Sequence, residues 1–496
     1  MSSHRFAAPP LHRLTASLSL GAAALVLAGC ASQGPAHAPL ATLAPDALGL
    51  QARSAPDASA DVSVNAALPT AQWWAALGDA QLNQLVAQAL QGNPSLAASQ
   101  TRLDKALALA TATSSATDVR GSFTTDATRQ HYSANGMIPA PIAGHTYNSG
   151  NVQLGLGWNP DFFGKHRAEL DAALGQARAA QADRAAAATQ LAGQVARSYV
   201  ALARLLAQRD VAQRTLVQRQ ALLDLSQQRT RAGLDSQVEL TQAQAGLPDA
   251  RTQVEMLDEQ ITLARRTIAV LCGQAPDAQQ ALAPQLAALQ LQAVPTVLGA
   301  DLLGRRPDVV AARWRVEAAT RGIDSAKAEF YPDVNLTAFV GLSSVGLDQL
   351  FQGSSRQLGV TPALRLPIFD GKRLRAQLRG KQADLDSAIA QYNGVVLDAV
   401  KGAGDAMASM QSLERQQQLQ AESLAKAERA YDFAVQRYQA GLTGQVVVLN
   451  TETQVIAQRR LSVDLRAREL DTRIALMQAL GGGWQDDTAR VQLSQK

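Results

Sequence analysis

Apolar side chains recur every three or four residues along two very long stretches of this chain that contain no proline. The first stretch runs from Lys165 to Ala232, and the second runs from Lys372 to the C-terminus. Steps of three and four place side chains on one face of a helix, as in a coiled coil. At 1.5 Å per residue, a helix of about 65 residues is about 100 Å long. Such an element does not fit a compact domain, and we expect it to span a gap. The apolar seams are Val195, Tyr199, Leu202 and Leu206; Leu257, Ile261, Ile268 and Leu271; and Leu424, Tyr431, Val435, Tyr438 and Leu442.

Four shorter segments alternate between apolar and polar residues, which predicts β-strands. They lie at 119–132, 151–158, 334–341 and 358–366. Their length is close to the 9–11 residues of a tilted membrane strand, although a half-exposed sheet in water would show the same alternation. Open strand edges are not tolerated in lipid, and the smallest membrane barrels have about eight strands. If these are membrane strands, several copies of the chain must combine.

The chain also repeats itself. The segment 229–238 matches 437–446 at an offset of 208 residues, and Asn93-Pro94 matches Arg306-Pro307 at an offset of 213. Each half is predicted to run helix, strand, strand, long helix, turn, helix. The predicted division is a first repeat at 71–285, a linker at 286–300, a second repeat at 301–484 and a tail at 485–496.

The N-terminus has the pattern of a secretory signal at residues 1–29. A basic head is followed by an apolar segment from Leu14 to Leu27, which is too short to span a membrane comfortably. The ending Leu27-Ala28-Gly29-Cys30 resembles a bacterial lipobox, which implies N-acyl and S-diacylglycerol lipid (palmitate among the chains) on Cys30. An ordinary signal peptide that happens to contain a cysteine is the alternative. Residues 30–70, rich in Ala, Pro and Ser, are predicted to be a flexible tether.

Composition excludes several classes of function. The formal charge of +4 falls to +2 once the two signal arginines are removed, and no basic cluster suggests nucleic acid. Cys272 is the only other cysteine, so no disulfide forms within a lipidated chain. The histidines are scattered, without metal-ligand spacing or a nearby nucleophile. We therefore predict no enzymatic activity, no metal and no cofactor apart from the lipid.

Several motifs, in order, resemble the outer-membrane efflux channels of the TolC superfamily, in the lipoprotein branch of NodT/OprM type. This resemblance implies a mainly helical fold with a membrane β-barrel. Three chains would each contribute four strands to one twelve-stranded barrel, and their helices would form a periplasmic tube. An inner-membrane efflux pump and a periplasmic adaptor would dock at the closed end, making the trimer a passive duct for drugs or other small molecules in a Gram-negative outer membrane. The motifs are Trp73-Trp74, 93–96, 161–165, 305–309, 330–332, 367–371 and 479–484.

The two repeated turns are the candidate docking site. Gly233 and Gly441 each follow a long helix, where glycine accommodates a left-handed turn. By resemblance these turns form the periplasmic tip, so adaptor docking is assigned to Arg229, Gly233, Arg437 and Gly441.

The family often has an inward-facing carboxylate about nine residues after the second tip glycine, where three copies narrow the pore. Here that position is Asn450, with Glu452 close by, while the first repeat offers Asp235 and Glu239. All four are pore-constriction candidates; solvated helix-face residues are the alternative. Pro248, whose counterpart is Ile456, is predicted to bend its helix.

Two other functions remain open at this point. A lipid-anchored periplasmic adaptor also has coiled-coil hairpins, and a structural envelope protein would need no transport role. The duplicated helix and strand pattern favours the channel. The transported substrate and the class of pump are not encoded in any pattern that we identify.

Overall fold

The computed structural model describes residues 37–43, 70–290 and 302–485. The predicted signal peptide, Cys30 and most of the predicted tail lie outside these ranges, as does most of the predicted linker. By its contacts the chain divides into two units. The sheet unit holds the described part of 1–41 together with 104–178 and 313–391, and the hairpin unit holds the described parts of 42–103, 179–312 and 392–496.

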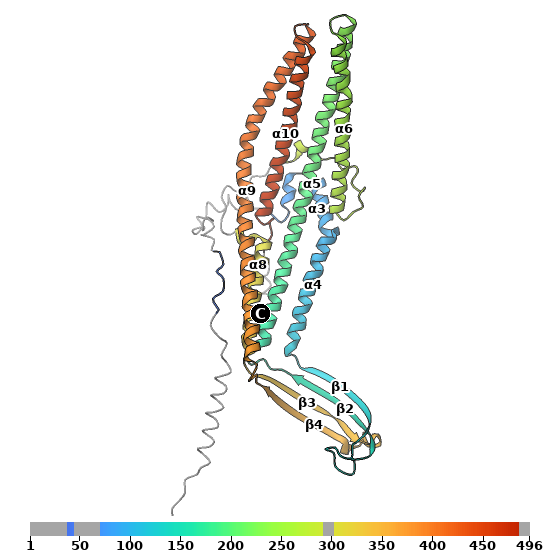
Figure 1. The fold of residues 1–496 in the computed structure, drawn as a ribbon, viewed down its shortest axis with the longest axis vertical. Coiled ribbons are helices and arrows are strands. Elements are labelled where there is room, and N and C mark those ends of the chain that lie inside the picture. The colour runs from blue at the N-terminus through green and yellow to red at the C-terminus, as the bar shows by residue number, and fades with distance from the viewer. Residues whose placement is uncertain (1–36, 44–69, 291–301, 486–496) are drawn as a thin grey trace, which may run out of the picture. The chain divides into compact units, whose positions relative to one another are not determined.

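The described elements follow the predicted order in both halves (Figure 1). The two longest helices, α5 and α9, have 67 and 69 residues and are each about 100 Å long at 1.5 Å per residue. The first half contains α3 Ala80–Gly92, α4 Pro94–Ser114, β1 Arg120–His131, β2 Thr146–Trp158, α5 Lys165–Arg231 and α6 Gln237–Leu271. The second contains α7 Leu302–Arg305, α8 Pro307–Ala328, β3 Asp333–Val345, β4 Arg356–Arg365, α9 Gly371–Gln439 and α10 Gln445–Ala479. Short 3-10 helices are η2 Trp73–Leu77, η3 Ser115–Thr117, η4 Leu286–Ala288, η5 Leu347–Gln349 and η6 Gly353–Ser355.

The four strands form one antiparallel sheet in the order β1-β2-β3-β4, as the alternating pattern predicted. Phe123, Leu154, Val340 and Leu358 are cross-strand neighbours, so they form one row on one face. All four side chains are exposed, and Leu358 is 78% exposed. No described helix is long and apolar enough to cross a membrane.

The opposite face of the sheet is polar. The Gln357 amide donates to Asn151 Oδ1 at 2.8 Å, and the Asn151 amide donates to Asp126 Oδ1 at 3.2 Å. Side chains of successive strand residues point to opposite faces, which explains how one short sheet has an apolar face and a polar face.

In the hairpin unit, α5 pairs with α6 and α9 pairs with α10, each pair forming a helical hairpin. The predicted seams at Val195, Tyr199 and Leu202 and at Leu257, Ile261 and Ile268 are buried, which confirms them. Leu442, predicted to continue the third seam, is instead 69% exposed because the chain has already entered a turn at that point.

The repeat is visible in equivalent contacts at the base of each hairpin. Gly273 follows α6 and Gly481 follows α10, both with positive φ. A Cβ at Gly273 would lie 2.2 Å from the Gly92 carbonyl oxygen, and one at Gly481 would lie 2.1 Å from the Arg305 carbonyl oxygen. Glycine is therefore required at both positions for two reasons, the conformation and the close approach.

A second pair of contacts fixes the same junctions. The Asn93 amide donates to the Leu271 carbonyl at 2.9 Å, and Arg306 Nη1 donates to the Ala479 carbonyl at 3.3 Å. Both carbonyls lie at helix C-termini, where the last carbonyls lack partners within the helix. In each repeat, the residue before the proline (Asn93 or Arg306) therefore caps the C-terminus of the second helix of the hairpin.

Part of the predicted flexible tether has defined contacts. Residues 37–43 hydrogen-bond to α9 through Asp386 and Asn393. The Ala, Pro and Ser composition predicted a flexible tether and gave no sign of these contacts. Composition could not reveal the two acceptors, because they lie more than 300 residues away in the chain.

Candidate functional site

Each hairpin ends in the same turn. Leu234 N–H donates to the Arg229 carbonyl at 2.9 Å, and Leu442 N–H donates to the Arg437 carbonyl at 2.8 Å. Gly233 and Gly441 have φ values of 73° and 74°. This is the Schellman arrangement, in which a left-handed glycine allows two backbone bonds to close the helix. The predicted structural role of both glycines is confirmed.

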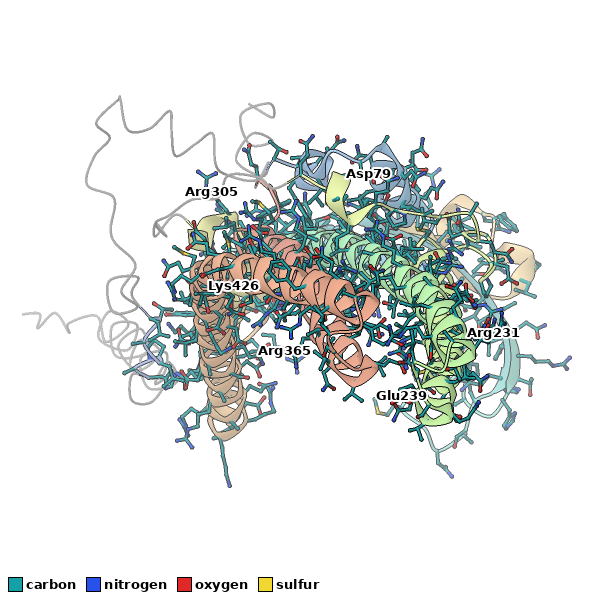
Figure 2. The ribbon with its side chains drawn as sticks, turned by 90° about the horizontal axis from the view of Figure 1, so that it is seen from above. Asp79, Arg231, Glu239, Arg305, Arg365 and Lys426 are labelled. Atoms are coloured by element: carbon teal, nitrogen blue, oxygen red, sulfur yellow. The ribbon has the colours of Figure 1, made fainter. Side chains whose placement is uncertain are left out.

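Both tips present exposed apolar side chains at equivalent positions of the repeat. Leu234 and Val238 are 66% and 63% exposed, and Leu442 and Val446 are 69% and 54% exposed. An exposed apolar patch on a soluble surface commonly marks a protein contact. We did not select these four residues from the sequence; the signal was available in their recurrence 208 residues apart. Figure 2 shows the first tip from its end, marked by Arg231 and Glu239.

The two tips differ in how the returning helix begins. Ser236 caps α6, its hydroxyl accepting Val238 N–H at 3.2 Å, while the Glu239 carboxylate accepts Ser236 N–H at 2.9 Å. This reciprocal capping box holds the pKa of Glu239 below its usual range, mainly through the Ser236 hydroxyl. The counterpart of Ser236 is Gly444, which has no side chain to cap α10.

Arg229 joins the first tip to the second hairpin. Its Nε and Nη2 lie 3.0 and 3.1 Å from the two Asp235 carboxylate oxygens, and its Nη1 donates to the Tyr438 carbonyl at 3.1 Å. The guanidinium also lies 4.6 Å from the Tyr438 ring centroid, and the Tyr438 hydroxyl donates to Asp235. We call Arg229, Asp235 and Tyr438 the tip triad.

The electrostatics of the tip triad follow from this geometry. Hydrogen bonds from Arg229 hold the pKa of Asp235 below its usual range. Burial, reinforced by the Asp235 carboxylate, raises the pKa of Tyr438 to about 12. A bidentate guanidinium–carboxylate pair is among the stronger side-chain interactions. The tip triad therefore ties α9 to the turn between α5 and α6.

A buried charge lies further along the hairpins. Glu452 on α10 is 2% exposed, and its nearest cationic partner is Arg219 Nε on α5 at 3.4 Å. Arg219 also donates through Nη1 to the Gly246 carbonyl on α6 at 2.8 Å. Burial raises the pKa of Glu452, and the Arg219 charge opposes that shift. Arg219 thus links three helices. Helix α6 is continuous through Pro248, and its predicted bend stays a prediction.

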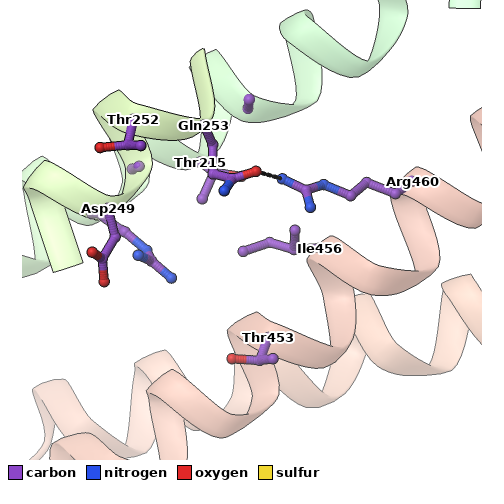
Figure 3. Close-up of a pocket in the computed structure, with 10 residues that line it drawn as sticks. Thr215, Asp249, Thr252, Gln253, Thr453, Ile456 and Arg460 are labelled. Atoms are coloured by element: carbon purple, nitrogen blue, oxygen red, sulfur yellow. Dashed lines mark hydrogen bonds between the residues drawn. The ribbon is translucent and has the colours of Figure 1, made fainter. Parts of the chain in front are cut away.

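A polar groove of about 430 Å³ lies beside this pair (Figure 3). Asp249 and Gln253 of α6 line it on one side and Arg460 of α10 on the other, and Arg460 donates to Gln253 at 3.4 Å. The lining supplies guanidinium groups and hydrogen bonds rather than an apolar surface.

The predicted site residues differ in exposure and in their partners. Of the docking candidates, Gly233, Gly441 and Arg437 are exposed, whereas Arg229 is largely enclosed by the tip triad. Of the four pore-constriction candidates, Asp235 pairs with Arg229 and Glu452 is buried against Arg219. Asn450 and Glu239 keep accessible side chains. The assignment of these four residues to a pore constriction stays a prediction.

Residues of other candidate chemistry are dispersed. Within the described ranges, no group of three His, Cys, Asp or Glu side chains could hold a metal ion. His166 lies 3.2 Å from Glu169, and His131 lies 3.1 Å from the Thr146 hydroxyl. Cys272 is a buried free thiol.

Known proteins resemble this chain over nearly all of its length. The family model described as outer membrane efflux protein matches residues 85–274 and 298–482. Fusaric acid resistance protein FusA of Burkholderia cepacia is 38% identical over 383 residues, covering 75% of this chain and 70% of that protein. Multidrug resistance outer membrane protein MdtP of Escherichia coli is 32% identical over 484 residues, covering 96% and 97%. The crystal structure of VceC from Vibrio cholerae matches with a TM-score of 0.80 and 33% identity, covering 84% of this chain and 100% of that one.

Proposed function

This chain belongs to the outer membrane efflux protein family, and we propose that three copies of it form the outer-membrane duct of a tripartite efflux system. The channel function itself follows from membership, since relatives of near-full length are outer-membrane efflux proteins. The adaptor and structural-spacer alternatives find no such support. Our proposal concerns the copy number, the partners, the lipid anchor and the role of each functional residue.

The four-stranded sheet is the observation that carries this proposal. Its apolar row of Phe123, Leu154, Val340 and Leu358 is exposed, and β1 and β4 each have one edge that no described strand pairs. A bilayer offers an apolar row a favourable environment, but it offers an open edge no hydrogen-bond partner. Pairing β4 of one copy with β1 of the next satisfies both requirements, and three copies give twelve strands.

We assign adaptor docking to the two hairpin tips. The exposed pairs Leu234 with Val238 and Leu442 with Val446 supply equivalent apolar contacts, and the exposed Arg437 adds a charge. Three chains would present six such tips, three of each kind. A periplasmic adaptor with a matching set of apolar contacts would bind these six tips and connect the trimer to an inner-membrane pump.

The lipid and the substrate complete the proposal. Cys30 carries the lipid, which assists sorting, while the strands hold the trimer in the membrane. The duct is passive and has no enzymatic activity. Relatives are named for resistance to fusaric acid and to multiple drugs, so we propose that the pump sets the substrate.

Copy number is tested by cross-linking between the edge strands. Each variant carries one cysteine on the free edge of β1 and one on the free edge of β4. Oxidation in the outer membrane then forms a disulfide between adjacent copies wherever the two cysteines face each other. Cys272 is buried, which keeps the background low. We expect one register of cysteine pairs to give a ladder that ends at the covalent trimer. A ladder that ends at the dimer, or cross-links formed within one chain, would contradict the proposal.

A further inference from the structure

Polar contacts join α5 of the first hairpin to α10 of the second hairpin, within the hairpin unit. Three of them are Arg197 with Gln478, Gln208 with Asp464, and Arg219 with Glu452. Positions rise along α5 as they fall along α10, so the two helices run antiparallel. The side chain of Asp464 is 41% exposed, whereas that of Glu452 is 2% exposed. The third contact is therefore a dry one in an interface whose other carboxylate is hydrated.

The Glu452 carboxylate lacks the hydrogen bonds that a buried charge requires. Among the residues that the structure describes, none donates a hydrogen bond to either of its oxygens. Arg219 Nε lies within ion-pair distance, but Nη1 of the same guanidinium is held by the Gly246 carbonyl at 2.8 Å. Gln445, seven residues before Glu452 on the same face of α10, is also buried, and its amide has no described partner either. We call Arg219, Gln445 and Glu452 the polar seam.

The charged and titratable groups around Glu452 come from each neighbouring helix. Arg219 of α5 is its nearest cation, and Asp249 of α6 lines the groove beside that guanidinium (Figure 3). Tyr431 of α9 is close enough for Glu452 to help raise the pKa of its hydroxyl, after burial. Arg459 of α10, which acts on the same tyrosine, is paired with a carboxylate of α9 at 3.0 Å. Arg219 alone therefore opposes the burial that raises the pKa of Glu452.

We propose that Glu452 is a proton-dependent switch between the two hairpins: when protonated it packs dry against α5, and when ionised it admits water and loosens the polar seam. A buried carboxylate without hydrogen bonds favours its neutral form, and hydration favours the ionised form. The inference goes beyond the duct proposed above, and it depends on neither the copy number, the partners nor the lipid.

The switch occurs once in each chain. At the offset of 208 residues, the counterpart of Glu452 is Gln244 and the counterpart of Arg219 is Ala427. The repeat therefore duplicates the hairpins without duplicating the buried charge. The dependence on pH is a property of the contact between α5 and α10.

The direction of the pH dependence follows from the geometry. When the polar seam separates, Glu452 is hydrated and its pKa returns toward the ordinary value of 4.5. Below that value Glu452 is protonated in both states, so the packed seam has its full stability. As pH rises through the raised pKa, this stability is lost, by up to about tenfold in the equilibrium for each pH unit between the two pKa values. The seam is therefore tightest in acid.

The first measurement follows the Glu452 proton itself. The infrared band of protonated carboxyl groups is recorded for the purified full-length protein between about pH 4 and 8. Glu452→Gln removes the contribution of this one residue and keeps the shape of its neutral form. We expect the difference between the two proteins to titrate with a midpoint above 4.5. A midpoint at or below that value overturns the proposal.

The second measurement follows the packing of the seam. Amide hydrogen exchange of the peptides 215–226 and 445–456 is compared between the original protein and Glu452→Gln at the same pH, so that the intrinsic exchange rates cancel. We expect equal protection at about pH 4 and at least about threefold faster exchange of the original protein at pH 8. Glu422→Gln changes an exposed carboxylate paired with Lys426, and it should match the original protein throughout. Equal exchange of the original protein and Glu452→Gln at every pH rules out the switch.

A second variant tests the role of the opposing charge. Arg219→Gln removes the cation nearest to Glu452, so the infrared midpoint of Glu452 should rise above that of the original protein. The exchange of the 445–456 peptide should then begin to increase at a correspondingly higher pH. If the infrared midpoint stays the same or falls in Arg219→Gln, the buried pair does not control the proton and the proposal fails.

Discussion

Arg229 and Arg437 occupy equivalent positions of the repeat, yet they have different environments. Arg229 is held by Asp235 and Tyr438, whereas the counterpart of Asp235 is Thr443, which offers no carboxylate to Arg437. The matching sequence of the two repeats therefore predicted the turns correctly but gave no sign of the different partners of the two arginines, and their role in adaptor docking stays a prediction. The tip triad could not be predicted, because Tyr438 comes from a helix more than 200 residues away.

The first prediction concerns Gly441. Space around this residue is open, so Gly441→Asp adds a charge at the tip at a conformational cost of about 1 kcal/mol. We expect drug export to fall severalfold while trimer assembly persists. Drug susceptibility of cells and the oligomer on native gels measure the two effects. Gly441→Ala has the same conformational cost without the charge and should retain export; unchanged export in Gly441→Asp would refute docking at this tip.

The second prediction concerns the acid stability of the tip triad. The pKa of Asp235 is lower in the folded protein, so its pair with Arg229 stabilises the fold above the unfolded value of about 3.9 and is lost as pH falls through the lowered pKa. Asp235→Asn should lower the free energy of unfolding by about 1–3 kcal/mol at pH 7. Between pH 5 and 2, the free energy of unfolding should then fall less in this variant than in the original protein.

Thermal unfolding of the purified protein across that pH range measures this difference. Asp224→Asn, an exposed carboxylate on the same hairpin, is the matched control and should leave the melting temperature nearly unchanged. If the melting temperature falls equally with pH in the original protein and in Asp235→Asn, the Arg229–Asp235 pair contributes nothing to stability.

The third prediction compares two carboxylates as pore charges. Glu239 is accessible and stays ionised within its capping box, whereas Glu452 is buried against Arg219. Glutamine also completes a capping box, so Glu239→Gln removes charge while keeping the helix start. We expect Glu239→Gln to shift the reversal potential of bilayer-reconstituted channels more than Glu452→Gln does. The reverse order would contradict the assignment of Glu239 to the pore.

At the scale of elements, periodicity predicted the architecture well. Proline-free tracts with steps of three and four became α5 and α9, and four alternating segments became the sheet, because both patterns are local properties of the chain. Strand limits were less accurate. The pattern began at Asn151, whereas β2 begins at Thr146, since the polar residues between them are held by pairing with β1 rather than by burial.

The fourth prediction tests the two faces of the sheet. Leu358→Lys puts a charge in the exposed apolar row, which in a bilayer should cost about 2–4 kcal/mol near the midplane. We expect reduced assembly in the outer membrane, measured as heat-resistant trimer in membrane fractions. Thr361→Lys lies on the opposite face of the same strand and should assemble normally. Equal assembly of both variants would exclude contact between this row and lipid.

At the scale of the whole molecule, the chain contains two copies of one structural repeat, and its sheet is incomplete. Equivalent glycines, Gly273 and Gly481, close the two hairpins in the same way. The sheet, in contrast, ends in two unpaired edges within the described chain. The need for further copies follows from those edges, whereas the number three comes from the family resemblance. No local pattern in the sequence specifies a copy number.

The fifth prediction is also the most direct test of the central claim, that this protein is a channel. The purified full-length protein is added to a planar phospholipid bilayer, and single-channel currents are recorded at fixed voltage. We expect discrete, uniform conductance steps, with Cys30→Ser lowering the frequency of insertion but not the size of the step. Insertion of the intact protein into the bilayer without any conductance would contradict the account.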